Sequence, residues 1–301
     1  MLNIRLIPLK QTVRLDELGE AGDGAPKLII ADAYVAGAED WQPQRWGWAT
    51  ERDGRSVLNV DHHAPTASMR RAVSSGNLAL EYVAEQGPLR SDQGRVLINH
   101  CDCDSVVSSA ILAGIVPADP RFGRAVLAAD HTGHADEIAD ALQPLESLRD
   151  LELSLATLRQ LLDGEPLSEP ARGLMEARLR ERAAWGEAIQ RADAVRWVDR
   201  VAVVVRPDRV PTELLVSLVP EAVAIMTAKP AGDGKWVAKL RLGLAAPNGM
   251  SLLDLGIQTF DPAFGGRWNA GSNNRGGGAP IDPETYAANL AAAIRRRSTT
   301  Q

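Results

Sequence analysis

Histidine and aspartate gather at three places in this chain. All five histidines lie in groups with an aspartate, each at the end of an apolar segment. The groups are Asp61-His62-His63, His100-Cys101-Asp102-Cys103-Asp104 and Asp130-His131-Thr132-Gly133-His134. Histidines that only fill a core have no reason to gather in this way. Imidazoles beside carboxylates form a ligand set for a hard divalent metal, so the sequence predicts a metal centre.

The segment from Val96 to Ser105 is the central group. Its apolar start, Val96-Leu97-Ile98, predicts a buried strand. Because side chains alternate along a strand, we expect His100, Asp102 and Asp104 to project together. Cys101 and Cys103 would then point the other way and pack in the core. Their C-x-C spacing is also not that of a usual zinc knuckle. A strand end carrying three solvated polar residues is the alternative interpretation.

A pair of divalent metals about 3.5–4 Å apart needs a bridging carboxylate and several terminal ligands, and it can act on a phosphoryl group. Carboxylates with a few imidazoles suit Mn²⁺ or Mg²⁺ better than a thiolate zinc site. The chain offers seven candidate ligands of these types: Asp32, Asp61, His62, His100, Asp102, Asp104 and Asp130.

A second constellation lies near the carboxyl end, in the segment from Phe264 to Gly278. Glycines let backbone amides approach an anion closely, and arginine presents a forked donor that matches phosphate. We therefore expect phosphate binding here, with a flexible surface loop as the alternative. The candidate substrate-binding residues of this segment are Gly265, Gly266, Arg267, Asn269 and Arg275.

Composition limits the class of protein. The chain has 301 residues, of which 45% are hydrophobic and 24% charged, which is ordinary for a soluble globular protein. A net charge of -6 argues against a surface that grips nucleic acid all over, although it leaves room for a local basic groove. Two cysteines form no disulfide framework, and the amino terminus has no apolar signal segment. We expect a cytoplasmic protein without a membrane span.

The elements that must position the candidate ligands follow an α/β rhythm. Apolar strands are predicted at 27–31, 56–60 and 96–98, and helices at 72–86, 105–115 and 122–129. This order predicts a mainly parallel sheet with ligand groups at the carboxyl ends of its strands. Three tryptophans at 41–48 are expected to pack over a core edge rather than stack on a substrate.

Three regions are expected along the chain. Residues 1–145 form the metal-binding catalytic domain, 146–195 a helical linker, and 196–301 a smaller α/β domain that binds substrate. In the last region, strands are predicted at 201–205, 222–227 and 236–244. Short and long helices are predicted at 213–218, 252–258 and 283–297.

These motifs resemble those of the DHH phosphoesterase superfamily, which includes manganese pyrophosphatases, RecJ-type nucleases, and enzymes that degrade short oligonucleotides or cyclic dinucleotides. Val57 to His63 looks like the name-giving motif, and His100 to Asp104 looks like the family's H-x-D-x-D motif. Residues 201–297 are similar to the companion DHHA1 domain. The H-x-D-x-D motif follows the DHH motif here instead of preceding it, which implies a permuted sheet. Ser105 replaces the usual glycine, and Arg267 the usual histidine.

The resemblance implies an enzyme with two Mn²⁺ ions, or Mg²⁺ in their place. It implies that the ligands are Asp32, His62, His100, Asp102, Asp104 and Asp130. His63 would contact phosphate, and we expect His63, Asp61 and Asp102 to be catalytic, with His131 and His134 as further candidates. The expected function is hydrolysis of a phosphodiester or phosphoanhydride in a nucleotide or short oligonucleotide. A pyrophosphatase and a catalytically silent nucleotide-binding protein are the alternatives, and a homodimer is left open.

Overall fold

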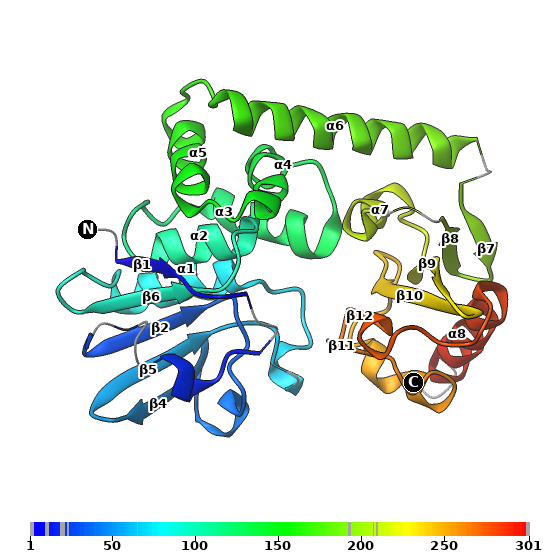
Figure 1. The fold of residues 1–301 in the computed structure, drawn as a ribbon, viewed down its shortest axis with the longest axis horizontal. Coiled ribbons are helices and arrows are strands. Elements are labelled where there is room, and N and C mark those ends of the chain that lie inside the picture. The colour runs from blue at the N-terminus through cyan, green and yellow to red at the C-terminus, as the bar shows by residue number, and fades with distance from the viewer. Residues whose placement is uncertain are drawn as a thin grey trace. The chain divides into compact units, whose positions relative to one another are not determined.

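The computed structural model describes residues 3–9, 12–18, 22, 24–64, 66–191, 194–206, 208 and 210–298. The chain divides into two compact units (Figure 1). The first consists of Met1–Asp130 and Ala135–Leu179, and the second of His131–His134 and Arg180–Gln301. The division falls within the long helix α6 (Glu169–Gln190). The domain boundaries at residues 145 and 195 stay predictions.

A six-stranded sheet is the frame of the first unit, with the strand order β1-β6-β2-β5-β4-β3. Its strands are β1 Ile4–Leu6, β2 Lys27–Ala31, β3 Gln42–Gln44, β4 Gly47–Arg52, β5 Arg55–Val60 and β6 Gly94–Ile98. β1, β6, β2 and β5 are parallel, whereas β3 and β4 form an antiparallel extension beside β5. The carboxyl ends of β2, β5 and β6 therefore meet at one edge of the sheet. This confirms the predicted mainly parallel α/β architecture.

The helices of this unit are α1 Ser75–Gln86, α2 Cys103–Leu112, α3 Pro120–Leu127, α4 Glu137–Leu142, α5 Leu151–Asp163 and the start of α6. α1 and α2 pack on each other and on the parallel strands, as Figure 1 shows. The apolar run Leu28–Ala31 of β2 is fully covered. Such a continuous apolar run is typical of a parallel strand that is buried on both faces.

The tryptophan segment belongs to this core. Trp46 and Trp48 are buried, and the Trp46 ring meets Tyr82 of α1 edge-on at a centroid distance of 5.3 Å. The rings of Trp46 and Trp48 therefore contribute to packing of the core, as predicted. In the described ranges of the chain, no helix combines the length and the apolar character that a membrane crossing needs.

The second unit has its own six-stranded sheet, with the order β11-β12-β10-β9-β8-β7. Its strands are β7 Arg196–Val198, β8 Val201–Val205, β9 Ala224–Gly232, β10 Lys235–Leu242, β11 Gly265–Gly266 and β12 Ala270–Ser272. Only the pair β8–β9 is parallel among these described strands. The glycine-rich segment 264–278, predicted as a loop, therefore contains a small hairpin.

Helices cover both faces of the second sheet. α7 (Thr212–Leu218) packs through Leu215 and Val216 on one face. α8 (Pro283–Ser298) packs through Tyr286 and Leu290 on the other. The alternating side chains of β8 divide between these two clusters, as period-2 geometry requires.

Candidate metal centre

Three chain segments meet at the carboxyl edge of the first sheet. Asp32 directly follows β2, Asp61-His62-His63 directly follows β5, and His100 lies two residues after β6. Since neighbouring parallel strands end together, side chains far apart in sequence become neighbours here.

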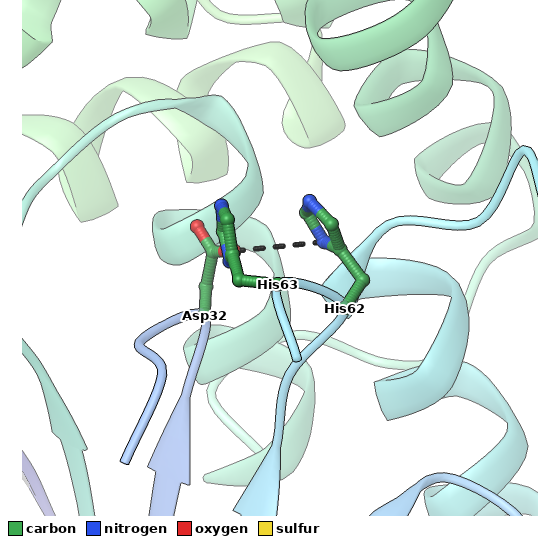
Figure 2. Close-up of side chains that lie close together, drawn as sticks. All are labelled: Asp32, His62 and His63. Atoms are coloured by element: carbon green, nitrogen blue, oxygen red, sulfur yellow. Dashed lines mark ion pairs between the residues drawn. The ribbon is translucent and has the colours of Figure 1, made fainter. Parts of the chain in front are cut away.

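The first cluster joins Asp32 to the two histidines of the Asp61-His62-His63 segment (Figure 2). Asp32 Oδ1 lies 3.8 Å from His62 Nδ1 and 3.7 Å from His63 Nδ1. The two imidazole rings stack with a centroid distance of 4.1 Å and an interplanar angle of 26°. Figure 2 shows Asp32 at the end of β2 and both histidines beyond the end of β5.

The second cluster joins the same aspartate to His100 and Asp102. Asp32 Oδ2 lies 3.2 Å from His100 Nε2, and Asp102 Oδ2 lies 3.3 Å from the same nitrogen. Asp32 therefore faces one cluster with each of its oxygens. A carboxylate shared in this way has the arrangement of a bridging ligand.

The prediction that His100, Asp102 and Asp104 alternate along a strand is wrong. β6 ends at Ile98, and Asp102 is the N-cap of α2, where its Oδ1 accepts a hydrogen bond from Ser105 N at 2.9 Å. Asp104 lies in the first turn of α2. An aspartate that can cap a helix competes with strand formation, so the chain turns into a helix here.

Asp104 lies behind His62. Its two oxygens accept the backbone N–H groups of Ser75 and Gly76 at 2.8 and 2.7 Å, at the start of α1. Its Oδ2 is 3.2 Å from His62 Nδ1. Glycine at position 76 allows this approach, because a Cβ there would lie 2.7 Å from Val126 and 3.2 Å from Asp104 Oδ1.

Asp130 faces the other nitrogen of the same ring. It lies in a π-helical turn, Ala128–Thr132, directly after α3. Its Oδ2 is 3.1 Å from His62 Nε2. π-helical turns of this kind occur frequently at functional sites.

Asp61 is not a member of either cluster but contacts His63 of the first one. The Asp61 side chain is fully buried, and its Oδ1 lies 2.7 Å from His63 Nδ1. Asp61 Oδ2 also accepts the backbone N–H of His63 at 2.9 Å. Asp61 thus orients the imidazole of His63, whose side chain remains 34% exposed.

Sequence reasoning missed the polar residues that hold the ligands. Asn59, inside β5, accepts a hydrogen bond from Val35 N and donates to the carbonyls of Ile30 and Ala33. These bonds hold the turn that contains Asp32, whose φ of 50° lies in the left-handed region. An amide within an otherwise apolar strand was the available signal for this role.

A polar residue that the sequence analysis did not single out also supports His100. Its Nδ1 lies 2.6 Å from Asn99 Oδ1, and the Asn99 carbonyl accepts a hydrogen bond from Arg149 Nη1 at 3.0 Å. Partners behind the ring of a ligating histidine commonly set its orientation. They direct His100 Nε2 toward Asp32 and Asp102.

The electrostatics of the cluster are dominated by opposite charges at close range. Burial by itself lowers the pKa of His100, but the carboxylates of Asp102 and Asp32 raise that pKa to about 12. Burial likewise raises the pKa of Asp32, but the histidines, His100 foremost, bring that pKa well below its usual range. Burial and the charges of Asp32, Asp130 and Asp102 raise the pKa of Asp104.

The donor set fits a divalent cation. In the described part of the chain, the ion pairs of Asp32, Asp102 and Asp104 are all with histidines, so no lysine or arginine neutralises this buried acidic group. Buried charges are normally paired or coordinate metals. Oxygen donors with a few imidazoles suit Mn²⁺ or Mg²⁺.

The two cysteines are not part of this donor set. Cys101 and Cys103 belong to the buried core of the first unit, which confirms the packing role predicted for them. Burial raises the pKa of both thiols, which disfavours the thiolate that a metal would need.

The glycine- and arginine-containing segment lies in the second unit. Gly265 and Gly266 form β11, and Arg267 N donates to the Ala270 carbonyl at 2.8 Å to close the hairpin. Arg267 is half-buried, whereas Arg275 is exposed on a short 3-10 turn.

His131 meets this segment within the second unit. Its Nδ1 lies 3.0 Å from Asn269 Nδ2, and its ring stacks on Trp268 at a centroid distance of 6.1 Å. Asn269 Oδ1 is buried and has no hydrogen-bond partner among the described residues. The fourth residue of the 131–134 segment, His134, is exposed. Asn269 and His131, predicted separately, are therefore in contact, which their distance in sequence concealed.

Solved structures with a similar course of the chain include two enzymes. A pGpG-specific phosphodiesterase, PggH from Vibrio cholerae, is 9% identical over 73% of this chain and 89% of its own, with a TM-score of 0.42. A manganese-bound exonuclease RecJ is 14% identical over 96% of this chain and 80% of its own, with a TM-score of 0.40. No family model matches the chain. No curated protein matches it either.

Proposed function

We propose that this protein is a divalent-cation-dependent phosphoesterase. Its proposed reaction is hydrolysis of a phosphodiester or phosphoanhydride in a nucleotide or short oligonucleotide. One observation carries the proposal. Asp32 faces His62 and His63 with one oxygen and His100 and Asp102 with the other, which suits two neighbouring cations.

The residues proposed to hold two Mn²⁺ or Mg²⁺ ions are Asp32, His62, His100, Asp102, Asp104 and Asp130. Bound cations supply Lewis acidity and offset the negative charge of a phosphoryl group. Asp104 accepts two backbone N–H groups at the start of α1, which fix its carboxylate. Because Asp104 Oδ2 lies 3.2 Å from His62 Nδ1, the fixed carboxylate also keeps His62 in place.

His63 is proposed to contact the substrate phosphate. Its Nδ1 is engaged by Asp61 at 2.7 Å, which leaves the opposite edge of the ring for a ligand. A carboxylate behind an imidazole fixes the orientation of the ring. In the second unit, Arg267 is proposed to bind phosphate through its planar guanidinium.

An activity panel with Mn²⁺ tests the proposal. The substrates are dinucleotides, 3′-phosphoadenosine phosphate, cyclic dinucleotides and pyrophosphate, each with and without a chelator. We expect chelator-sensitive hydrolysis of at least one nucleotide and its loss in Asp102→Asn. Asp119→Asn is the matched control, because Asp119 caps the start of α3, forms an ion pair with Arg121 and is not among the proposed ligands.

The panel also separates the alternatives. Turnover of pyrophosphate alone would indicate a pyrophosphatase. Tight nucleotide binding without turnover of any substrate would contradict an enzymatic role. Hydrolysis that persists in chelator would contradict the assignment of a cation-dependent reaction.

A further inference from the structure

Two serine hydroxyls bracket Asp32. Ser75 Oγ donates to Asp32 Oδ1 at 3.0 Å, and Ser105 Oγ donates to Asp32 Oδ2 at 2.7 Å. Both serines are fully buried, and so is Asp32 apart from 1% of its surface. Each oxygen of one carboxylate is thus held by a different hydroxyl.

Each hydroxyl also lies beside a different histidine. Ser75 Oγ is 3.2 Å from His62 Nδ1, and Ser105 Oγ is 3.1 Å from His100 Nε2. Ser75 therefore contacts both Asp32 Oδ1 and His62. Ser105 contacts both Asp32 Oδ2 and His100. The two serines divide the site into two halves that meet at Asp32.

The Ser105 hydroxyl differs from those of the other serines of α2. Ser108 and Ser109 are equally buried, but their hydroxyls donate to the carbonyls of Ser105 and Val106, one turn earlier in the same helix. That local bond is usual for a serine within a helix. Ser105 instead points out of the helix, to a residue 73 positions away in the sequence.

We propose that Ser75 and Ser105 are positioning residues that set the plane of the Asp32 carboxylate. The terminal torsion of aspartate has a broad preference, so the side chain alone does not choose this plane. With one donor on each oxygen, Oδ1 is held on the side of His62 and Oδ2 on the side of His100, where each oxygen would serve a cation if two were bound. This inference rests on the proposed two-cation site. It assigns to two residues outside the ligand set the division of the Asp32 oxygens between the two cation positions.

The test uses the full chain with Ser75→Ala and Ser105→Ala, and Mn²⁺ as the probe. Isothermal titration gives stoichiometry and affinity, and anomalous scattering from Mn²⁺-soaked crystals gives the occupancy of each position. Loss of an outer partner of a metal ligand typically costs about 10–100-fold in metal affinity. We expect Ser105→Ala to weaken the position beside His100 by this amount and to spare the position beside His62. Ser75→Ala should have the opposite effect.

Ser108→Ala and Ser109→Ala are matched controls, because each removes the same buried hydroxyl from α2 without touching Asp32. Both should bind two Mn²⁺ ions like the unmodified protein. Thermal unfolding in chelator checks that each variant is folded. Ser→Cys at either position keeps the shape of the side chain and a weak donor, so it should give a smaller loss.

Three results would overturn the inference. The first is equal weakening of both positions by either variant, since a general loss of packing would act in that way. The second is unchanged Mn²⁺ binding in both variants. The third is fewer than two ions bound by the unmodified protein. Two ions bound without hydrolysis of any phosphoester would refute the proposed function and leave the role of the serines intact.

Discussion

Asp61 holds His63 at two points, through the imidazole Nδ1 at 2.7 Å and through the backbone N–H at 2.9 Å. In Asp61→Asn the amide oxygen can still accept the backbone N–H of His63, but the contact with the imidazole loses the carboxylate charge and its ability to accept from Nδ1–H. We expect kcat/KM to fall about 10–100-fold, as for loss of a charge-assisted hydrogen bond. Mn²⁺ affinity should stay unchanged in titration calorimetry, and a variant with full activity would contradict the role assigned to His63.

The pKa of His100 makes cation binding dependent on pH. Its usual value of 6.5 is raised to about 12 in the folded, metal-free protein by Asp102 and Asp32, against the effect of burial. The His100 ring is then protonated at neutral pH, and the stability from its ion pairs is fully present below about pH 6.5 and is lost as pH rises toward 12. A cation needs the neutral imidazole, so Mn²⁺ affinity should rise with pH between 7 and 9.

Proton release measures this effect directly. Titration of Mn²⁺ in two buffers of different ionisation enthalpy should show about one proton released from His100 per protein at pH 7.5. The release should fall in His100→Gln and stay unchanged in His134→Gln, whose exposed ring lies in the second unit. Equal binding heats in both buffers for the unmodified protein would refute the raised pKa.

Asn59 should matter for stability as well as for the site. Asn59→Ala leaves Val35 N and the carbonyls of Ile30 and Ala33 without their side-chain partner in a buried turn. We expect the free energy of unfolding to fall by about 2–4 kcal/mol, because unsatisfied buried polar groups are costly. Urea unfolding in chelator measures this loss, and Mn²⁺ titration should show weaker binding because Asp32 loses its support.

Asn274→Ala is the control for this change, since Asn274 is exposed. Its effect should stay within about 0.5 kcal/mol. If both variants unfold at the same urea concentration, the Asn59 bonds do not hold the Asp32 turn.

Arg267→Lys tests the glycine- and arginine-containing segment. Lysine keeps the charge but loses the planar fork that binds phosphate with two bonds. We expect kcat/KM on the nucleotide substrate to fall about 10–100-fold. Mn²⁺ affinity should not change, because all proposed ligands belong to the first unit. The exposed Arg275, changed to lysine, should give a smaller loss, and unchanged kinetics in Arg267→Lys would leave this segment without a role in substrate binding.

The types of residue in the site, and the strands that deliver them, were predictable from the sequence. Apolar runs such as Leu28–Ala31 form strands because both of their faces are buried, and polar groups that follow such runs collect at one sheet edge. Asp32, His62 and His100 could therefore be expected to lie near each other. Segment boundaries were less certain, because Asp102 can either continue a strand or cap a helix, and only the bond to Ser105 N decides between them.

Only the tertiary structure decided which polar atoms of the site contact each other. Ser75 and Ser105 reach Asp32 from two different helices, Asp104 holds the start of α1, and Asn269 meets His131 across more than a hundred residues of chain. None of these pairs has a local periodicity, because each depends on how helices pack over the sheet or on how a hairpin folds back. Hydrogen bonds are short and directional, so their partners are set only when packing has placed both groups within about 3 Å.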